Sequence, residues 1–356
     1  MKYLFFSSVI ALLFIMPGLA PKTSLPLNMT VHAVQPQVRQ CLANGWQQAN
    51  VQVVGSSREL LWKGPQGLWN KGAMLVLHGG GGQHYQWCVA NDPSVEPQVT
   101  FSNMAIVEGF VVFLLNSSDK ITDNDGRLCG KVWDDEVRDR ANLDLLLIGE
   151  VIRVLIPQVR PRESRAEIFM TGLSSGGYMT ARASTHFDNL ITAFAPVASG
   201  DPYGWHRICD PALSPRRDNV NGIGIDNETG KNISEINACR AESYPHEKTW
   251  DTANPAFKPT FKLFQHENDG INDLSCNDKI ERQLEAHGYR NTGRFLLRGG
   301  QRNLANHLWQ PAYNRPILDF FASRLEQQAQ QPMSSLFATV SHGQTAMIFS
   351  SPKVSQ

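Results

Sequence analysis

The sequence predicts an α/β fold, in which a mostly parallel sheet carries helices on both of its faces. Short apolar runs typical of buried strands alternate along the chain with longer segments whose apolar residues recur at helical spacing. This alternation favours parallel strands that are joined by helices. The length of 356 residues fits one domain of this class, because α/β folds often run long as a single unit.

The apolar pattern also places the individual elements. The expected strands are 52–54, 74–77, 110–115, 167–171, 191–197, 260–264 and 294–297. The expected helices are 135–156, 178–187, 278–287 and 316–328. The first of these helices has leucine and isoleucine at helical spacing, and Pro157 is expected to end it.

The N-terminus has the pattern of a secretory signal peptide over residues 1–20. Met1 and Lys2 precede an apolar run, 3–16, that is shorter than the roughly 18 to 20 residues a membrane span needs. Cleavage after Ala20 is expected, with Ala33 as an alternative site. An uncleaved anchor is the competing interpretation.

The rest of the chain divides by composition. The folded domain is expected over 34–326, and a polar segment rich in Gly, Pro and Asn, 201–259, is expected to be an insertion or lid. Residues 327–356 are rich in Gln and Ser and are expected to form a polar tail. Tyr203 and Trp205 begin the insertion, where they either stack on a substrate ring or pack in a small core of its own.

The balance of charges gives no electrostatic case for an anionic partner. The chain has 33 Lys and Arg against 33 Asp and Glu, which gives a net charge of +0. Nucleic acids and anionic membrane surfaces attract proteins with a positive excess, so neither is an expected partner. A small neutral or a polymeric substrate is compatible with this balance.

The cysteines favour disulfide bonds. The six are Cys41, Cys88, Cys129, Cys209, Cys239 and Cys276, and no C-x-x-C pair suggests zinc or redox chemistry. An even number in an exported chain is typical of paired cysteines, with 15 possible connectivities. Cys209 and Cys239 bracket the insertion and are positioned to staple it. The glycosylation sequons begin at Asn28, Asn116, Asn227 and Asn232.

The most informative segment is 167–177, EIFMTGLSSGG, which has the form of a nucleophile elbow. In so sharp a strand-to-helix turn, the residues two before and two after the serine must lack bulk, and Gly172 and Gly176 meet that need. The turn would expose the hydroxyl of Ser174 and direct the amide of Ser175 at a developing oxyanion. The competing interpretation is an ordinary glycine-rich turn with a surface serine.

A second glycine-rich turn supplies the other half of such a site. The apolar run 73–77 ends in His78 and four glycines, 79–82, whose backbone can approach a ligand closely. The amide of Gly80 or Gly81 is the expected second oxyanion donor. A phosphate-binding loop is the alternative, but neither the Lys-Ser/Thr of a P-loop nor the G-x-G-x-x-G spacing is present.

A serine nucleophile requires an acid and a base, which follow the serine in this order in α/β-hydrolases. Asp269 lies just beyond the expected strand 260–264 and is the preferred acid, with Glu267 and Asp273 as competitors. A calcium loop is a third interpretation, although the spacing and the terminal glutamate of an EF-hand are absent. His307 is the preferred base, because it alone follows the expected strand 294–297 and precedes the last helix. The other nearby histidines are His266, His287 and His342.

These segments together carry a family resemblance. The series LHGGGG, EGFVVFLLN, WDDEVRD, IFMTGLSSGGYM, FAPVASG and HLW before ILDFF resembles the secreted esterases grouped with poly(3-hydroxybutyrate) depolymerases and feruloyl or acetylxylan esterases. The resemblance covers roughly 70–325 and implies the α/β-hydrolase fold for the catalytic domain. It implies Ser174 as nucleophile, Asp269 as acid and His307 as base, and for Trp133-Asp134-Asp135 a structural turn.

The resulting expectation is a secreted or periplasmic serine esterase that needs no cofactor and no metal. Its partner would be a carboxylic ester, possibly polymeric, with no nucleic acid and no stable membrane insertion; the oligomeric state stays open. Two other functions compete. One is a prolyl-oligopeptidase-like peptidase, for whose propeller domain too few residues precede Met74. The other is an inactive α/β-hydrolase used as a binding module, which would normally have lost the serine or the histidine.

Overall fold

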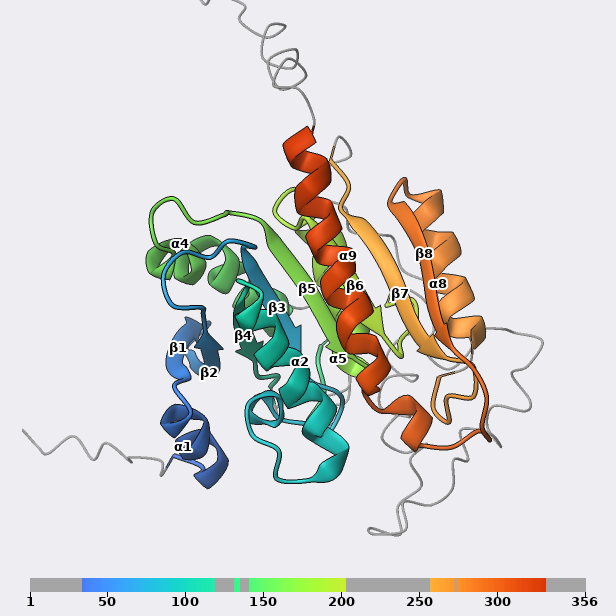
Figure 1. Cartoon of the computed structure of the whole chain (residues 1–356), viewed down its shortest axis with the longest axis horizontal. Coiled ribbons are helices and arrows are strands. Elements are labelled where there is room, and N and C mark those ends of the chain that lie inside the picture. Colours follow the sequence, from blue (N-terminus) through green and yellow to red (C-terminus); the bar gives the residue numbers. More distant parts are fainter. Residues whose placement is uncertain (1–33, 119–130, 135–140, 203–256, 273, 331–356) are drawn as a thin grey trace, which may run out of the picture. The chain divides into compact units, whose positions relative to one another are not determined.

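The computed structural model of the chain describes residues 34–118, 131–134, 141–202, 257–272 and 274–330. The helices and strands of this part lie in one compact unit that begins at Pro36 (Figure 1). Its strands are β1 Gln47–Val53, β2 Ser56–Lys63, β3 Ala73–Leu77, β4 Val111–Leu115, β5 Ile168–Leu173, β6 Ala193–Val197, β7 Thr260–His266 and β8 Arg290–Leu297. They form an eight-stranded sheet.

The strand order is β1-β2-β4-β3-β5-β6-β7-β8. The hairpin β1–β2 and the pair β2–β4 are antiparallel, whereas β4, β3, β5, β6, β7 and β8 are parallel to their neighbours. Strands β3, β4, β5 and β6 are buried along their whole length, which explains their continuous apolar sequences. The carboxyl ends of the parallel strands therefore meet at one edge of the sheet.

Helices cover both faces of this sheet. The described helices are α1 Pro36–Ala43, α2 Glu96–Val107, α3 Leu143–Glu150, α4 Ile156–Val159, α5 Ser175–His186, α8 Leu274–Ala286 and α9 Pro311–Gln330. In Figure 1, α2 and α9 lie side by side in front of the sheet, and α5 lies behind it. The predicted α/β-hydrolase fold, a mostly parallel sheet with helices on both faces and a serine in the turn after its central strand β5, is confirmed.

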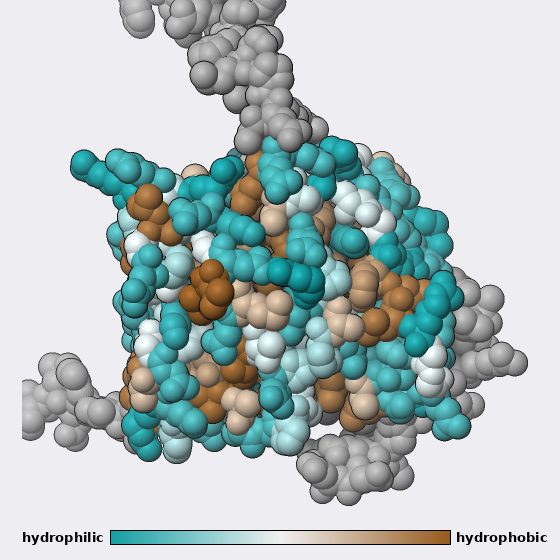
Figure 2. Space-filling view, viewed as in Figure 1, coloured by the Kyte–Doolittle hydropathy of each residue, from teal (hydrophilic) through white to brown (hydrophobic). Residues whose placement is uncertain are grey.

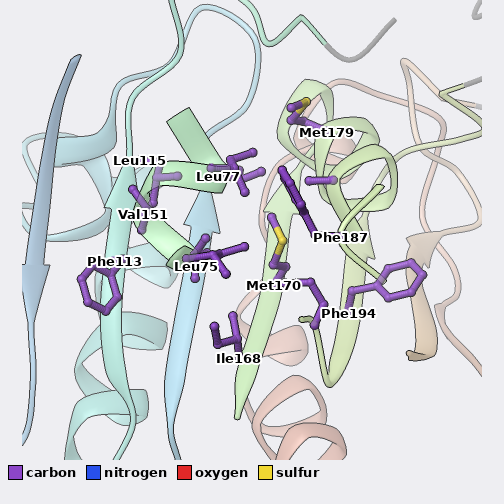
Figure 3. Close-up of a cluster of buried hydrophobic side chains, with 14 of the residues drawn as sticks. Leu75, Leu77, Phe113, Leu115, Val151, Ile168, Met170, Met179, Phe187 and Phe194 are labelled. Atoms are coloured by element: carbon purple, nitrogen blue, oxygen red, sulfur yellow. The ribbon is translucent and has the colours of Figure 1, made fainter. Parts of the chain in front are cut away.

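The alternation of side chains along the central strands divides the core into two layers. On β5, Ile168 and Met170 belong to the cluster that packs against α3 and α5, together with Leu75 and Leu77 of β3 (Figure 3). Phe169 points to the opposite face, where its ring lies 4.9 Å from that of Phe321 on α9. A buried parallel strand thus serves two hydrophobic layers at once.

The structure extends and corrects the expected elements. Strand β2 and helices α1 and α2 were not expected, and Val54, expected in a strand, lies in the β1–β2 turn with a positive φ of 45°. Helix α9 begins at Pro311, so that the expected first residue, Pro316, lies inside it.

The prediction that Pro157 ends a helix is wrong. The helical segment continues from α3 through a π-helical turn, Val151–Leu155, into α4, and Pro157 stands at the start of α4. A π-helical turn shifts the backbone bonding register from i→i+4 to i→i+5, and proline at the start of a helical segment removes no required N–H. The local change of register therefore accommodates the proline.

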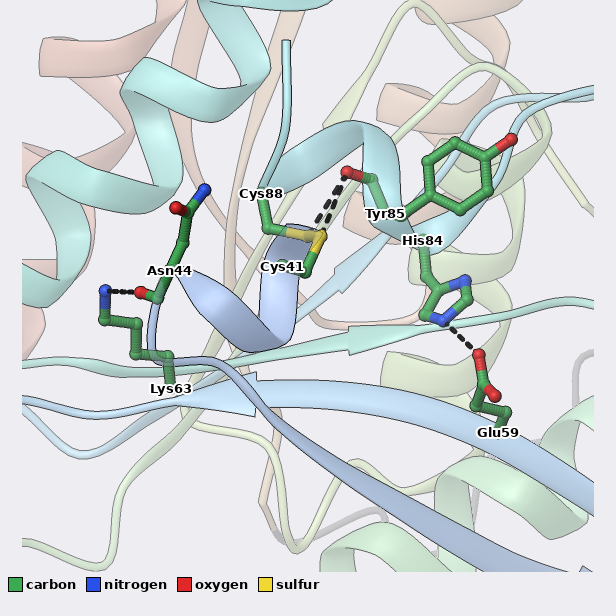
Figure 4. Close-up of a disulfide and its surroundings, with 7 residues drawn as sticks. All are labelled: Cys41, Asn44, Glu59, Lys63, His84, Tyr85 and Cys88. Carbon is green, nitrogen blue, oxygen red and sulfur yellow. Dashed lines mark hydrogen bonds and ion pairs between the residues drawn. A yellow bond between two sulfur atoms is a disulfide. The ribbon is translucent and has the colours of Figure 1, made fainter. Parts of the chain in front are cut away.

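A disulfide links α1 to the segment that follows the second glycine-rich turn. Cys41 of α1 is bonded to Cys88, with their Cα atoms 5.6 Å apart (Figure 4). Close by, Nε2 of His84 lies 2.8 Å from Oε1 of Glu59 on β2. Cys276 is also disulfide-bonded, and no free cysteine is found in the described ranges. Pairing is thus confirmed for three of the six cysteines.

The surface carries no large apolar area on the face seen in Figure 2, where hydrophobic residues form small patches between hydrophilic ones. Singly exposed apolar residues of this kind are normal for a folded protein. In the described part of the chain, no helix has both the length and the apolar composition to cross a membrane.

Several expectations concern residues outside the described ranges. They are the signal peptide with its cleavage sites, residues 203–256 of the insertion with Tyr203 and Trp205, the pairing of Cys209 with Cys239, Cys129, Asp135, Asp273, His342, the residues of the tail after 330, and the sequons at Asn28, Asn227 and Asn232.

Candidate active site

Ser174 lies in the turn between β5 and α5 with φ 53° and ψ −118°, a conformation that residues other than glycine rarely adopt. Two glycines permit this turn. A Cβ on Gly172 would lie 2.5 Å from the carbonyl oxygen of Gly176, and one on Gly176 would lie 2.4 Å from that of His78. The backbone crossing at the elbow therefore excludes any side chain at either position.

Backbone hydrogen bonds hold Ser174 from both sides. Its N–H donates to the carbonyl of Val197 at the end of β6, and its own carbonyl accepts from the N–H of Tyr178 in α5, both at 2.9 Å. The serine is half-buried, in contrast to its buried neighbours in α5. Within the described part of the chain, no hydrogen bond joins its hydroxyl to His307. Such bonds are often long without substrate and shorten in the complex.

The second glycine-rich turn lies beside this elbow. A Cβ on Gly80 would lie 3.7 Å from Cβ of Ser175. Gly81 donates its N–H to the carbonyl of Lys131 at 2.7 Å, whereas among the described residues the N–H of Gly80 has no hydrogen-bond acceptor. Of the two expected oxyanion donors, Gly80 is thus the one whose N–H can still donate to a ligand.

His78 fixes the orientation of the Gly80 amide. The N–H of Ser117 donates to Nε2 of His78 at 3.1 Å, so the ring proton lies on Nδ1, which is 2.7 Å from the Gly79 carbonyl. This carbonyl also accepts from the N–H of Gly82. Because the peptide is trans, the Gly80 N–H points away from both donors. Burial lowers the pKa of His78 to about 3, which keeps the ring neutral.

Trp133 joins the two turns. Its backbone N–H donates to Oγ of Ser175 at 3.0 Å, its indole Nε1 donates to the carbonyl of His78 at 2.7 Å, and its ring lies against that of His78. The side chain is buried. A structural role was expected for Trp133 and Asp134, and these contacts give Trp133 one.

The expected acid and base are in direct contact. Nδ1 of His307 lies 2.9 Å from each carboxylate oxygen of Asp269, and both side chains are buried. The carboxylate also accepts from the N–H groups of Ile271 and Asn272 at 2.7 and 2.9 Å, and from Nε2 of Gln265 at 3.1 Å. The carboxylate is thus contacted by four hydrogen-bonding groups, which fix its position.

The neighbouring acid has other partners. Oε1 of Glu267 accepts from the N–H of Gly299 at 2.6 Å, and its Oε2 lies 3.6 Å from Arg298. Among the competing histidines, Nδ1 of His266 accepts from the N–H of Asn268, and Nδ1 of His287 lies against Gln283. Among the candidate acids and histidines that the structure describes, Asp269 and His307 are therefore the pair in direct contact.

The charge of Asp269 also reaches Tyr313 on α9. Burial, together with the nearby charge of Asp269, raises the pKa of this phenol, which therefore stays neutral.

No group of three or more His, Cys, Asp or Glu side chains in the described ranges is arranged to hold a metal ion.

No pattern in the sequence singled out Gln265, Asn272 or Tyr178 as residues of the site. Gln265 is fully buried and Asn272 nearly so, and both contact Asp269. In a single sequence, amide side chains next to an acid look the same whether they hold the carboxylate or face solvent. Only the hydrogen bonds of the folded chain separate the two cases.

Among known proteins, the chain is similar to solved structures, but not to any protein-family model or curated protein. Solved structures similar to it include a thermostable esterase (TM-score 0.46, 15% identity, 79% of this chain and 63% of that chain). Another is a fungal esterase from Rhizomucor miehei (0.48, 17%, 83% and 89%). A third is an acylaminoacyl peptidase from Pyrococcus horikoshii (0.48, 14%, 78% and 41%). The chain spans less than two thirds of the first esterase and of the peptidase, and at these identities the likeness is one of fold.

Proposed function

We propose that this protein is a serine hydrolase that cleaves carboxylic esters, with Ser174 as nucleophile, His307 as general base and Asp269 as the orienting acid. The observation that carries the proposal is the pairing of a strained serine in a glycine-enclosed elbow with a buried imidazole–carboxylate contact. Both lie beyond the carboxyl ends of parallel strands, where α/β folds bind their ligands.

In the first half of the reaction, Nε2 of His307 accepts the hydroxyl proton as Oγ of Ser174 bonds to the ester carbonyl carbon. The imidazolium returns this proton to the alcohol as the carbon–oxygen bond breaks, leaving an acyl-serine. Water then attacks the acyl carbon, again with His307 as the base, and releases the carboxylic acid and free Ser174. Asp269 holds Nδ1–H of His307 and stabilises the imidazolium.

The oxyanion of each tetrahedral intermediate would bind to the backbone amides of Ser175 and Gly80. The orientation of the Gly79–Gly80 peptide supports Gly80, and the bond from Gly81 to Lys131 argues against Gly81. Removing one such donor typically costs about 10² to 10³ in turnover.

The sequence resemblance supports a finer assignment within the proposal. The substrate would be a polyester or an ester linked to plant polysaccharide, as in the depolymerase and feruloyl esterase group. The signal-peptide pattern of residues 1–20 and the disulfide between Cys41 and Cys88 support export to an oxidising compartment.

The test compares p-nitrophenyl esters with peptide p-nitroanilides for the purified chain and its Ser174→Ala variant. We expect release of p-nitrophenol from short-chain esters and a loss of about 10⁶-fold on removal of the hydroxyl. Circular dichroism of the variant should match the wild type, because the half-buried serine side chain is not part of the core.

Two results would contradict the proposal. Hydrolysis of the anilides at a rate equal to or above that of the esters would indicate a peptidase. Ester turnover that persists after Ser174→Ala would show that another group is the nucleophile.

A further inference from the structure

We infer that Asn272 is a positioning residue that holds the acid–base pair at a fixed separation from Ser174, an inference that rests on the proposed function. Asn272 follows β7 by six residues and is buried, with 8% of its surface exposed. Its backbone bonds to the acid half of the site, and its side chain bonds to the nucleophile half.

On the acid side, the N–H of Asn272 donates to Oδ1 of Asp269 at 2.9 Å. Its carbonyl accepts from Nε2 of Gln265 at 2.9 Å, and the same Gln265 nitrogen lies 3.1 Å from Oδ2 of Asp269. Asn272 and the carboxylate thus belong to one hydrogen-bonded loop. A displacement of Asn272 would carry Asp269 and its partner His307 along with it.

On the nucleophile side, Nδ2 of Asn272 donates to the carbonyl of Ala198 at 2.5 Å, and its Oδ1 accepts from the hydroxyl of Tyr178 at 3.3 Å. Both partners adjoin the groups that hold Ser174. Ala198 follows Val197, whose carbonyl accepts the Ser174 N–H, and the Tyr178 N–H donates to the Ser174 carbonyl.

Ala198 itself has a positive φ of 49°, which is strained for a residue with a side chain. Such a conformation persists only where its surroundings determine it, and the bond from Asn272 is one such contact. The amide suits both partners, because it donates to a carbonyl and accepts from a hydroxyl at the same time. The amide of Asn272 does not titrate, so replacing it with alanine alters no charge.

Catalysis depends steeply on such a separation, since a misplacement of about 1 Å costs roughly 100-fold in rate. Asn272→Ala removes both side-chain bonds and keeps the backbone contact with Asp269. We expect kcat for a p-nitrophenyl ester to fall about 30- to 100-fold, with KM changed less than about threefold. The midpoint of the acid limb of the pH profile should not move, because no charge is altered.

Turnover is counted per reactive serine, by titration with a fluorophosphonate that esterifies Ser174, so that inactive protein does not enter kcat. Asn268→Ala is the matched control. It removes the same kind of side chain from the same loop, but Nδ2 of Asn268 donates to the carbonyls of Gly299 and Gly300. We expect its kcat to stay within about threefold of the wild type.

Tyr178→Phe provides a second measurement that does not depend on the folding of Asn272→Ala. It deletes one of the two side-chain bonds and should lower kcat about threefold. In the Asn272→Ala background its effect on kcat should be smaller than in the wild type, because the bond between the two side chains is then already absent.

A kcat for Asn272→Ala within threefold of the wild type or of Asn268→Ala would overturn the inference, as would full additivity of the two changes. Two other results would instead contradict the proposed function, and with it this inference. One is a wild-type protein that does not react with the fluorophosphonate. The other is ester turnover that persists in the Ser174→Ala variant.

Discussion

The two halves of the candidate site are built in different ways. In the nucleophile half, Ser174 is placed by backbone packed against backbone, and glycines leave room for the crossing. In the acid–base half, Asp269 and His307 are placed by hydrogen bonds from side chains and amides that come from separate loops.

This difference explains why the nucleophile can be recognised from the sequence, whereas the acid cannot be chosen among its neighbours. A backbone crossing requires glycine at fixed distances from the serine, so its signature lies within six residues. A carboxylate held by amide donors has no such signature, because any acid in a polar loop has similar neighbours. The sequence thus left Glu267 and Asp273 beside Asp269, although it isolated Ser174.

The largest effect expected in the acid–base half comes from Asp269→Asn. The new amide would place N–H groups against Nδ1 of His307 and Nε2 of Gln265, favouring the wrong imidazole tautomer. We expect kcat to fall about 10⁴-fold, measured with a p-nitrophenyl ester.

Glu267→Gln is its matched control. Glu267 bonds to Gly299 and Arg298, so the change should alter kcat less than about threefold. A larger loss from Glu267→Gln than from Asp269→Asn would reverse the assignment of the acid.

In the nucleophile half, Gly176→Ala tests the backbone crossing. The added Cβ would meet the carbonyl oxygens of His78 and Leu77 at 2.4 and 2.5 Å, and neither can move without displacing a strand end. We expect a loss of about 3 kcal/mol in the free energy of unfolding, measured by urea denaturation, together with a loss of activity.

Gly149→Ala on α3 is the control for that change, because its Cβ would meet only side chains, the nearest being Phe187 at 3.2 Å. Its effect should lie within about 1 kcal/mol of zero, since alanine also favours the helix. Equal losses at Gly149 and Gly176 would show that the elbow is not especially intolerant.

The low pKa of His78, a residue of the nucleophile half, predicts that the stability of the protein depends on pH. Its folded pKa of about 3 lies below the ordinary value of 6.5, so the unfolded chain binds the proton first as the pH falls. The stabilisation is complete above pH 6.5 and is lost progressively towards pH 3, at up to about 1.4 kcal/mol per pH unit.

Urea denaturation of the wild type and of His78→Gln between pH 7 and pH 4 measures this contribution. The variant should be less stable at pH 7 and should lose stability less steeply below pH 6.5. Parallel curves would mean that His78 does not stay neutral in the folded protein.

The smallest expected effect comes from Val54, whose strained backbone conformation lies outside the candidate site. Val54, like Ser174, has a positive φ, but it is 73% exposed at the tip of the β1–β2 hairpin and precedes Gly55. Asparagine tolerates this conformation better than valine, and Asn-Gly is the preferred two-residue hairpin turn. Val54→Asn should therefore raise the free energy of unfolding by about 0.5 to 1 kcal/mol, with kcat unchanged. A destabilised variant would show that the Val54 side chain has a packing role.

The fold class, the central strands and the position of the elbow can all be predicted from local patterns in the sequence. Strands β3, β4 and β5 are short apolar runs because both of their faces are buried, and the glycines around Ser174 follow from local sterics. Strand β2, which mixes polar and apolar residues, and α2, with Pro97 near its start, carry no such pattern and were missed.

The folded chain is needed to know which acid lies against His307, which glycine N–H has no acceptor among the described residues, and that Gln265 and Asn272 contact Asp269. Each of these depends on the juxtaposition of loops from different strands, as in the contact between Asp269 and His307, which are 38 residues apart. Hydrogen bonds over such separations depend on where the sheet places its strand ends, whereas a steric demand inside one turn is already present in its own few residues.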